Sequence, residues 1–411
     1  MIKHRNSGQF FRLPEFLSES DDNMNKKISL GLALSLIAIA SAVTFILTSF
    51  FSLQSFNKKV MDVNEKSKKY NSLQSLDSYV REHYLGDINE GDLSDGILKG
   101  YISGLDDKYS RYLTEEEYLA EQSEDEGQLV GLGLTLEEDE NGYIRIAEIM
   151  EDSPVEEAGL REGDIITLID GVDVLTAGFN ESIEAMRGTE GSEINLTVRR
   201  GGIDKDYTFT RRSIEMITVT GKMVNEDVGY IEITGFKKNT PQQFVEALDR
   251  LISNGAKALI FDVRDNGGGI VDALSECLDP LLPEGVIATA EYKDGHSETL
   301  VYSDETKLDL PMVVLVNDQT ASAAELFAAS LRDFGGAQLV GEKTYGKGVM
   351  QQTTEFDNNG AVVLTVAKYK TELSECYDGV GLTPDISVEN TDENYDDQYS
   401  AAVDAAMAAL Q

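Results

Sequence analysis

The sequence is poor in the residues that most often provide catalytic bases and metal ligands. Its 411 residues include no tryptophan, two cysteines and three histidines. The cysteines, Cys277 and Cys376, are too few for a disulfide framework or a four-cysteine zinc site, and the sequence does not decide whether they pair. The histidines, His4, His83 and His296, lie in unrelated contexts. Catalysis by a histidine base therefore has little support.

Positive charge is also scarce. There are 35 lysines and arginines against 74 aspartates and glutamates, which gives a formal net charge of −39. Such a chain repels phosphate backbones, so nucleic acid is excluded as a partner of the molecule as a whole. The overall usage, with 41% hydrophobic and 27% charged residues, is that of a globular protein. At about 150 residues per domain, the length predicts two or three domains.

One long hydrophobic run lies near the N-terminus, at residues 28–51. These 24 residues carry no charge, and a helix of that length is about 36 Å long, enough to cross a hydrocarbon core of about 30 Å. A cleaved signal peptide would have a shorter apolar region and a cleavage site of small residues. Here a tail of residues 1–27 precedes the run and two phenylalanines end it, which favours an uncleaved transmembrane anchor. Lysine pairs flank both ends, so charge leaves the orientation open.

The residues after the anchor divide into four parts. Residues 60–125 show helical periodicity, whereas residues 127–213 contain strand-like runs around an Asn-Gly turn. Residues 214–390 alternate apolar strands with amphipathic helices, which predicts an α/β core. Residues 391–411 are expected to be an acidic linker and a C-terminal helix. A calcium-binding loop is not expected there, because the acidic residues do not have the fixed ligand spacing of such a loop and its turn glycine is absent.

The second part resembles the PDZ domains of bacterial proteases. The resemblance rests on the run SPVEEAGLREGDIITLIDG at residues 153–171. In such a domain an extended peptide adds to an open sheet edge, and its terminal carboxylate binds backbone N–H groups. Here those groups are expected from Leu132, Gly133 and Leu134. The alternative is a domain that only packs against its neighbour.

Three turns, each after a predicted strand, contain residues that could take part in catalysis. Residues 261–269 end in three glycines, which let backbone N–H groups approach an anion. In the second turn Ser322 precedes a predicted helix, although it could be an ordinary helix cap. In the third, Lys347 lies between two glycines, 25 residues after Ser322. One helix and one strand separate them, and such a step can return the chain to the same edge of the sheet.

A serine that attacks an amide needs a base, and the histidines are not placed to serve. A lysine can act if burial or positive neighbours lower its pKa toward neutrality. The three turns together, in this order and spacing, resemble the C-terminal processing peptidases, also called tail-specific proteases. The matching positions are Asp262, Arg264, Asn266, Gly268 and Gly269, then Thr320, Ala321, Ser322, Ala323 and Glu325, then Thr344, Gly346, Lys347, Gly348 and Gln351. Residues 105–110 and 379–385 also match, whereas Gly267 stands where the family usually has proline.

The resemblance implies a role for each of these groups. Ser322 is then the nucleophile, Lys347 the general base and Gln351 the residue that orients the lysine. The oxyanion hole would consist of backbone N–H groups, those of Gly268 or Gly269 and of Ala323. The implied fold is α/β, a crotonase-like core preceded by the PDZ domain, N-terminal helices and one transmembrane helix. No metal or organic cofactor is implied.

The implied activity is endoproteolysis near protein C-termini, outside the cytoplasmic membrane. The PDZ domain would bind the C-terminal tail of a substrate and gate the activity. A trypsin-like protease fits poorly, because no serine lies in a Gly-x-Ser-Gly-Gly context. The main alternative is a non-catalytic, membrane-anchored PDZ adaptor, against which the intact Ser322, Lys347 and Gln351 argue. The oligomeric state stays open, a homodimer included.

Overall fold

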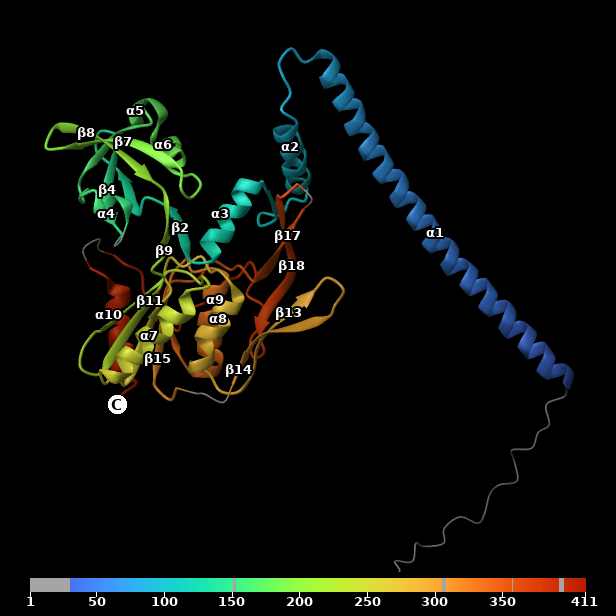
Figure 1. The fold of residues 1–411 in the computed structure, drawn as a ribbon. Coiled ribbons are helices and arrows are strands. Elements are labelled where there is room, and N and C mark those ends of the chain that lie inside the picture. The colour runs from blue at the N-terminus through green and yellow to red at the C-terminus, as the bar shows by residue number, and fades with distance from the viewer. Residues whose placement is uncertain (1–29, 151–152, 305–307, 357, 392–394) are drawn as a thin grey trace, which may run out of the picture. The chain divides into compact units, whose positions relative to one another are not determined.

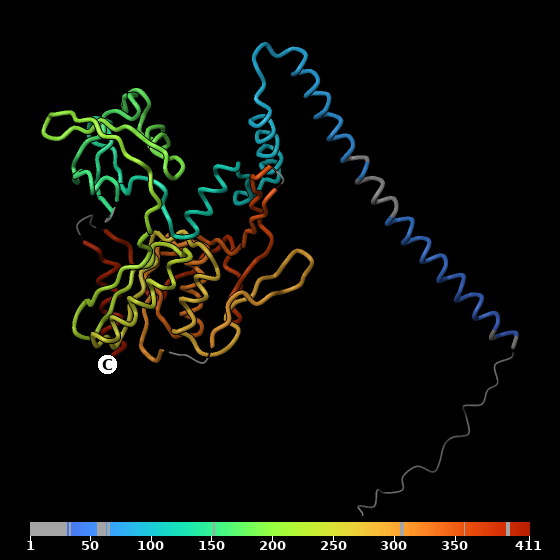
Figure 2. The backbone as a smooth tube through the Cα atoms, in the orientation of Figure 1, coloured from blue at the N-terminus to red at the C-terminus, as the bar shows by residue number. Residues whose placement is uncertain are grey.

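A computed structural model of the chain (Figure 1) describes residues 30–150, 153–304, 308–356, 358–391 and 395–411. The other residues are grey in Figure 2. The predicted tail at 1–27, the first two residues of the predicted anchor and residues 392–394 of the acidic segment lie outside the described residues. The chain divides into two compact units, one ending at Glu90 and the other running from Gly91 to Gln411.

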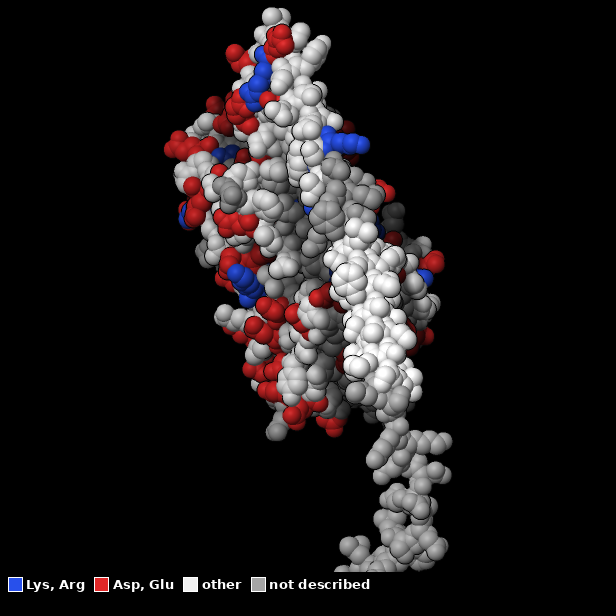
Figure 3. Space-filling model, turned by 90° about the vertical axis from the view of Figure 1, so that its right-hand side faces the viewer, with Lys and Arg blue, Asp and Glu red and all other residues white. Residues whose placement is uncertain are grey.

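The first unit contains one long helix, α1 (Leu30–His83), of 54 residues. Its segment Leu34–Ser55 is long and apolar enough to cross a membrane, with a mean hydropathy of 2.2 and no burial. In Figure 3 this part of α1 is a column without charged side chains. The helix continues well beyond the predicted anchor, and near its end Arg81 pairs with Asp77 one turn earlier.

The region predicted as helical, 60–125, also contains a strand, which corrects that prediction. Helices α2 (Glu90–Ser103) and α3 (Glu115–Asp125) are separated by β1 (Arg111–Leu113). This strand pairs with β18 (Ala361–Thr371), far away in the sequence, and its last two residues are buried. Three residues with so distant a partner carry no periodic signal of their own.

The centre of the second unit is a six-stranded sheet in the order β10-β11-β12-β15-β16-β19. All strands are parallel except β10, which joins antiparallel. The strands are β10 (Val219–Met223), β11 (Val228–Ile233), β12 (Ala258–Asp262), β15 (Met312–Val316), β16 (Gln338–Gly341) and β19 (Ile386–Ser387). Every residue of β12 and β15 is buried, as their continuous apolar runs predict.

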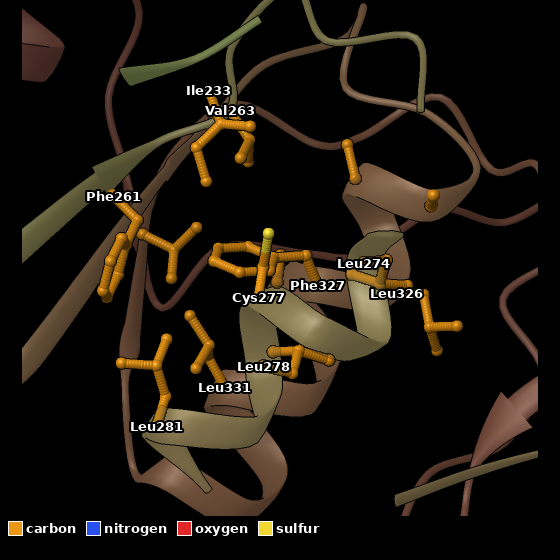
Figure 4. Close-up of a cluster of buried hydrophobic side chains, with 14 of the residues drawn as sticks. Ile233, Phe261, Val263, Leu274, Cys277, Leu278, Leu281, Leu326, Phe327 and Leu331 are labelled. Carbon is orange, nitrogen blue, oxygen red and sulfur yellow. The ribbon is translucent and has the colours of Figure 1, made fainter. Parts of the chain in front are cut away.

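Helices cover both faces of this sheet. One face packs against α7 (Thr240–Ser253), α8 (Val271–Leu278) and α9 (Ala323–Ser330), and the other against α10 (Asp397–Ala408). Two short turns, η1 (Asp279–Leu281) and η2 (Leu331–Gly335), extend α8 and α9. Figure 4 shows Cys277 of α8 and Phe327 of α9 next to each other within the larger core. Both cysteines are free thiols.

A second sheet is built around β18. This strand pairs with β1, with β13 (Gly285–Tyr292) and with β17 (Val349–Glu355), while β14 (Ser297–Ser303) pairs with β13. The sequence predicted β18 but neither the β13–β14 hairpin nor β17. Strand β17 begins directly after the turn that carries Lys347, here the lysine turn. The pairing of β17 in this sheet therefore fixes where the lysine turn ends.

The predicted PDZ region forms its own β-domain with a separate apolar core. Its sheet has the order β3-β4-β5-β7-β8, with β6 paired to β5. The elements are β3 (Leu134–Glu138), β4 (Ile144–Ile149), β5 (Ile165–Ile169), β6 (Val172–Asp173), β7 (Glu193–Arg200), β8 (Ile203–Thr210), α4 (Pro154–Glu157), α5 (Val174–Ala177) and α6 (Phe179–Met186). An antiparallel ribbon of β2 (Gln128–Gly131) and β9 (Arg212–Glu215) connects this domain to the rest of the unit.

The end of the chain is more closely integrated than the predicted acidic linker. Residues 386–387 extend the central sheet as β19, and the Asp396 carboxylate pairs with Arg264 at 2.9 Å. Helix α10 buries three alanines, Ala402, Ala405 and Ala406, against the sheet. Small side chains let the helix approach the strands closely. The acidic composition therefore does not mark this whole segment as solvated.

Candidate active site

The turn at residues 261–269, here the glycine turn, is in direct contact with the turn that carries Ser322, here the serine turn. The Thr320 hydroxyl donates to the Val263 carbonyl at 2.8 Å, and the Ala321 N–H donates to the Asn266 carbonyl at 2.9 Å. A Cβ atom added to Gly268 would lie 2.8 Å from the Cβ atom of Ser322. A side chain at residue 268 would therefore displace the serine, which explains the need for glycine there.

Ser322 has a strained backbone conformation. Its φ of 56° and ψ of −122° lie where residues with a side chain are rarely found. It directly precedes α9, so its hydroxyl lies near the positive end of the helix dipole. Strain of this kind persists only where the surrounding structure holds it, and it is frequent in active sites.

The carboxylate of Glu325 connects the serine turn to the lysine turn. Its Oε2 accepts the N–H groups of Ser322, at 3.1 Å, and of Lys347, at 2.7 Å. Its Oε1 accepts the Thr344 hydroxyl at 2.5 Å and the Gly346 N–H at 2.8 Å. The side chain is fully buried, and burial raises its pKa although these hydrogen bonds oppose the change. The sequence placed Glu325 in the motif but gave it no role.

Lys347 is partly buried and lies in a positively charged setting. Burial lowers the pKa of its amine, and the neighbouring Arg111 and Lys108 lower it further. Its Nζ lies 4.8 Å from the centre of the Tyr109 ring. A depressed pKa is the property that a general base needs near neutral pH.

Tyr369 of β18 contacts both turns, and the sequence gave no sign of this. Its hydroxyl donates to the Lys347 carbonyl at 2.7 Å, and its oxygen lies 3.4 Å from Ser322 Oγ. The side chain is only 2% exposed. In the sequence, Tyr369 is simply one more apolar residue of a predicted strand.

Gln351 lies on β17 beside the lysine turn. Its Nε2 donates to the Val349 carbonyl at 3.4 Å and to Thr365 Oγ1 at 3.3 Å. These contacts fix the amide of the side chain. The orientation of Lys347 by Gln351 stays a prediction.

The candidate oxyanion groups differ in their surroundings. The Gly268 N–H donates to Asn266 Oδ1 at 2.8 Å, so it already has an acceptor. Ala323 is the first residue of α9, where helix geometry leaves an N–H without an intrahelical acceptor. Gly269, with a φ of 136°, packs so closely on Phe236 that an added Cβ would lie 2.1 Å from its carbonyl oxygen. The oxyanion role of all three stays a prediction.

The candidate peptide site of the β-domain has the required open edge. Strand β3, which begins at Leu134, pairs only with β4 in the five-stranded order of the described sheet. Leu132 is buried, and Gly133 has a φ of 73° with Ser153 packed against it. Peptide binding there stays a prediction. In the described residues, no group of three or more His, Cys, Asp or Glu side chains could hold a metal ion.

Comparison with known proteins agrees with this geometry. Residues 227–388 match the model of peptidase family S41, and residues 122–199 match the PDZ domain. The chain is 33% identical over 356 residues to the carboxy-terminal processing protease CtpA of Bacillus subtilis, covering 86% of this chain and 75% of the relative. It is 34% identical over 321 residues to the carboxyl-terminal-processing protease of Synechocystis, covering 75% of each.

Among solved structures, a putative S41 protease from Bacteroides fragilis has the same fold. It aligns with a TM-score of 0.51 at 18% identity, over 80% of this chain and 92% of that one. The motifs in the three turns, the two domain matches and the two relatives lead to one conclusion. The chain belongs to peptidase family S41 and is a serine peptidase of the carboxyl-terminal processing type.

Proposed function

We propose that this peptidase is a membrane-anchored endopeptidase that cleaves proteins near their C-termini with a Ser322–Lys347 dyad. The observation that carries the proposal is the shared support of the two residues. Glu325 accepts the backbone N–H of both, and the Tyr369 hydroxyl contacts both. Burial also lowers the pKa of Lys347, as a lysine base requires.

In this mechanism Ser322 Oγ attacks the scissile carbonyl carbon as its proton passes to Lys347 Nζ. The resulting oxyanion is stabilised by backbone N–H groups of the glycine turn and of Ala323. The lysine then gives its proton to the departing amine, which leaves an ester on Ser322. A water molecule hydrolyses the ester, with the lysine as base again, and the serine is restored. Gln351 holds the lysine in position.

The PDZ domain is proposed to bind the C-terminal tail of the substrate and to gate cleavage. The open edge of β3 can accept an extended peptide, and the loop from Leu132 to Leu134 can bind its carboxylate. The apolar segment of α1 anchors the enzyme, with the catalytic part outside the cytoplasm. The names of the two relatives, both carboxyl-terminal processing proteases, support this assignment.

The test compares Ser322→Ala and Lys347→Ala with two matched controls in the full-length enzyme. Ser330→Ala removes a hydroxyl of the same helix that has no hydrogen-bond partner among the described residues. Lys343→Ala removes an exposed lysine of the same turn. We expect both active-site variants to lose cleavage of an unstructured protein with a free C-terminus, while folding is retained and both controls stay active.

Appreciable turnover by Lys347→Ala would exclude the dyad. A wild-type enzyme that binds C-terminal peptides but never cleaves them would instead support a PDZ adaptor. The double variant should be no less active than either single one, because the two residues act as a unit.

A further inference from the structure

A short segment outside both matched domains lies against the proposed catalytic residues. Residues 107–111 precede the PDZ match at 122–199 and the peptidase match at 227–388. The segment enters β1, whose first residue, Arg111, pairs with Val363 of β18. Strand β18 also carries Tyr369 and pairs with β17, which carries Gln351.

Aromatic rings of this region enclose two lysines. The Tyr109 ring centre lies 4.8 Å from Lys347 Nζ and 4.6 Å from Lys108 Nζ. Lys108 Nζ also lies 4.8 Å from the Tyr345 ring centre and donates to its hydroxyl at 3.3 Å. The amines of Lys347 and Lys108 therefore both lie against the Tyr109 ring.

A chain of hydrogen bonds leads from the same segment to Gln351. The Ser110 hydroxyl donates to Asp107 Oδ2 at 2.5 Å and accepts the Thr365 N–H at 3.1 Å. Thr365 Oγ1 in turn accepts Gln351 Nε2 at 3.3 Å. Asp107 also accepts the Tyr109 N–H at 3.3 Å, which fixes the backbone of the segment.

We propose that residues 107–111 form one wall of the catalytic site. In this wall Tyr109 is a positioning residue that shields the Lys347 amine from water, and Ser110 holds Gln351 through Thr365. The proposal rests on the proposed dyad and adds residues that neither domain match contains.

The charges around Lys347 agree with this role. Burial is the largest cause of its lowered pKa, and Arg111 and Lys108 add to it, whereas Tyr345 and Asp107 oppose it. From the other elements, the Glu325 carboxylate accepts the backbone N–H of Lys347, and the Tyr369 hydroxyl bonds its carbonyl. An aromatic ring attracts an ammonium group, but because burial dominates, loss of the ring is expected to raise the pKa of Lys347.

The experiment measures kcat/KM against pH for the full-length enzyme with Tyr109→Phe, Tyr109→Leu and the control Tyr112→Leu. Tyr109→Phe keeps the ring, to which the shielding of Lys347 is assigned, so its profile should match the wild type. Tyr109→Leu should shift the acid limb by about one pH unit to higher pH, with about tenfold lower activity on that limb and recovery at higher pH. Tyr112→Leu removes a buried ring of β1 that lies away from Lys347, and its acid limb should stay in place.

A second variant keeps the test decisive if Tyr109→Leu does not fold. Ser110→Ala breaks the chain of hydrogen bonds to Gln351 and should lower kcat about two- to tenfold, while Ser110→Thr keeps a hydroxyl and should restore it. The acid limb should stay in place in both. A wild-type kcat in Ser110→Ala, or an unchanged acid limb in folded Tyr109→Leu, overturns the proposal. If Lys347→Ala were active, the dyad itself would be wrong, so the two failures are distinguishable.

Discussion

At the scale of single residues, the site depends on one buried carboxylate. Glu325 accepts four hydrogen bonds, one from Ser322 and three from residues that lie 19 to 22 positions after Glu325 in the chain. An ionised carboxylate has acceptor sites for all of them, and no other common side chain of this length does. Its burial is therefore tolerated because every oxygen is satisfied.

Replacement of this carboxylate should reduce both activity and stability. In Glu325→Gln one oxygen becomes an amide donor, so two of the four donors lose their acceptor. Each buried unsatisfied donor costs about 1–3 kcal/mol, and we expect kcat to fall about tenfold or more. Thermal unfolding and steady-state kinetics measure the two effects. The control is Glu342→Gln, in the lysine turn but outside this hydrogen-bond network, which should behave as the wild type.

The Tyr369 hydroxyl should affect catalysis with little effect on substrate binding. Tyr369→Phe removes the hydroxyl that donates to the Lys347 carbonyl and contacts Ser322 Oγ. A net loss of about 0.5–1.5 kcal/mol corresponds to about a two- to tenfold lower kcat, whereas KM should hardly change. Tyr112→Phe is the matched control, because it removes the hydroxyl of another buried tyrosine, one that donates to Asp95 rather than to the two turns. Equal kcat values for both variants would contradict a role for Tyr369.

Residues with a motif could be predicted from the sequence, whereas residues with only a tertiary contact could not. Ser322 and Lys347 stand in glycine-rich turns after apolar strands, which is a local signal. Tyr369 contacts the turn that carries Lys347 from within β18, and Tyr109, although it stands in the matching stretch 105–110, comes near Lys347 next to β1, which pairs with β18. Nothing near them in the sequence encodes that proximity, because it depends on the register of the second sheet.

At the scale of elements, the open edge of β3 and the loop before it define the expected tail site. Gly133 needs its left-handed φ of 73°, and an added Cβ would lie 2.5 Å from Ser153 Cβ. Gly131, two residues earlier, has nothing within 4 Å of an added Cβ. Alanine at Gly133 would therefore disturb the loop geometry, whereas alanine at Gly131 would only reduce backbone flexibility.

Gly133→Ala should weaken tail recognition, whereas Gly131→Ala should not. The left-handed conformation costs alanine about 1–2 kcal/mol, and the contact with Ser153 adds to it. We expect KM for a free C-terminal substrate to rise about tenfold or more in Gly133→Ala. Binding of a C-terminal peptide, measured by fluorescence anisotropy, should fall in parallel. If an amidated substrate were cleaved as fast as the free acid, the tail would not be sensed by its carboxylate.

Elements with a strong burial pattern were predictable, and elements stabilised mainly by pairing were not. The buried strands β12 and β15 have continuous apolar sequences. The β13–β14 hairpin and β17 alternate less clearly, since much of β14 and β17 is exposed. Strands β13 and β17 pair with β18, and β14 pairs with β13, so strand pairing sets the position of all three.

At the scale of the whole molecule, the hydrophobic clusters of the described residues all belong to the second unit. The apolar part of α1 has no such partners, and its side chains are exposed. An apolar helix that the protein does not bury needs another apolar environment, which a bilayer provides. Activity and membrane attachment should therefore be separable.

Charges placed within the apolar segment should release the enzyme from membranes and leave its chemistry intact. A lysine near the centre of a membrane-spanning helix costs about 2.5–3.5 kcal/mol, so Val43→Lys with Ile46→Lys should strongly reduce carbonate-resistant association with lipid vesicles. Both residues lie within Leu34–Ser55. Tyr70→Lys, on the same helix beyond that segment, is the control. Cleavage of a soluble peptide should be equal in all three proteins, whereas full membrane retention of the double variant would contradict anchoring by α1.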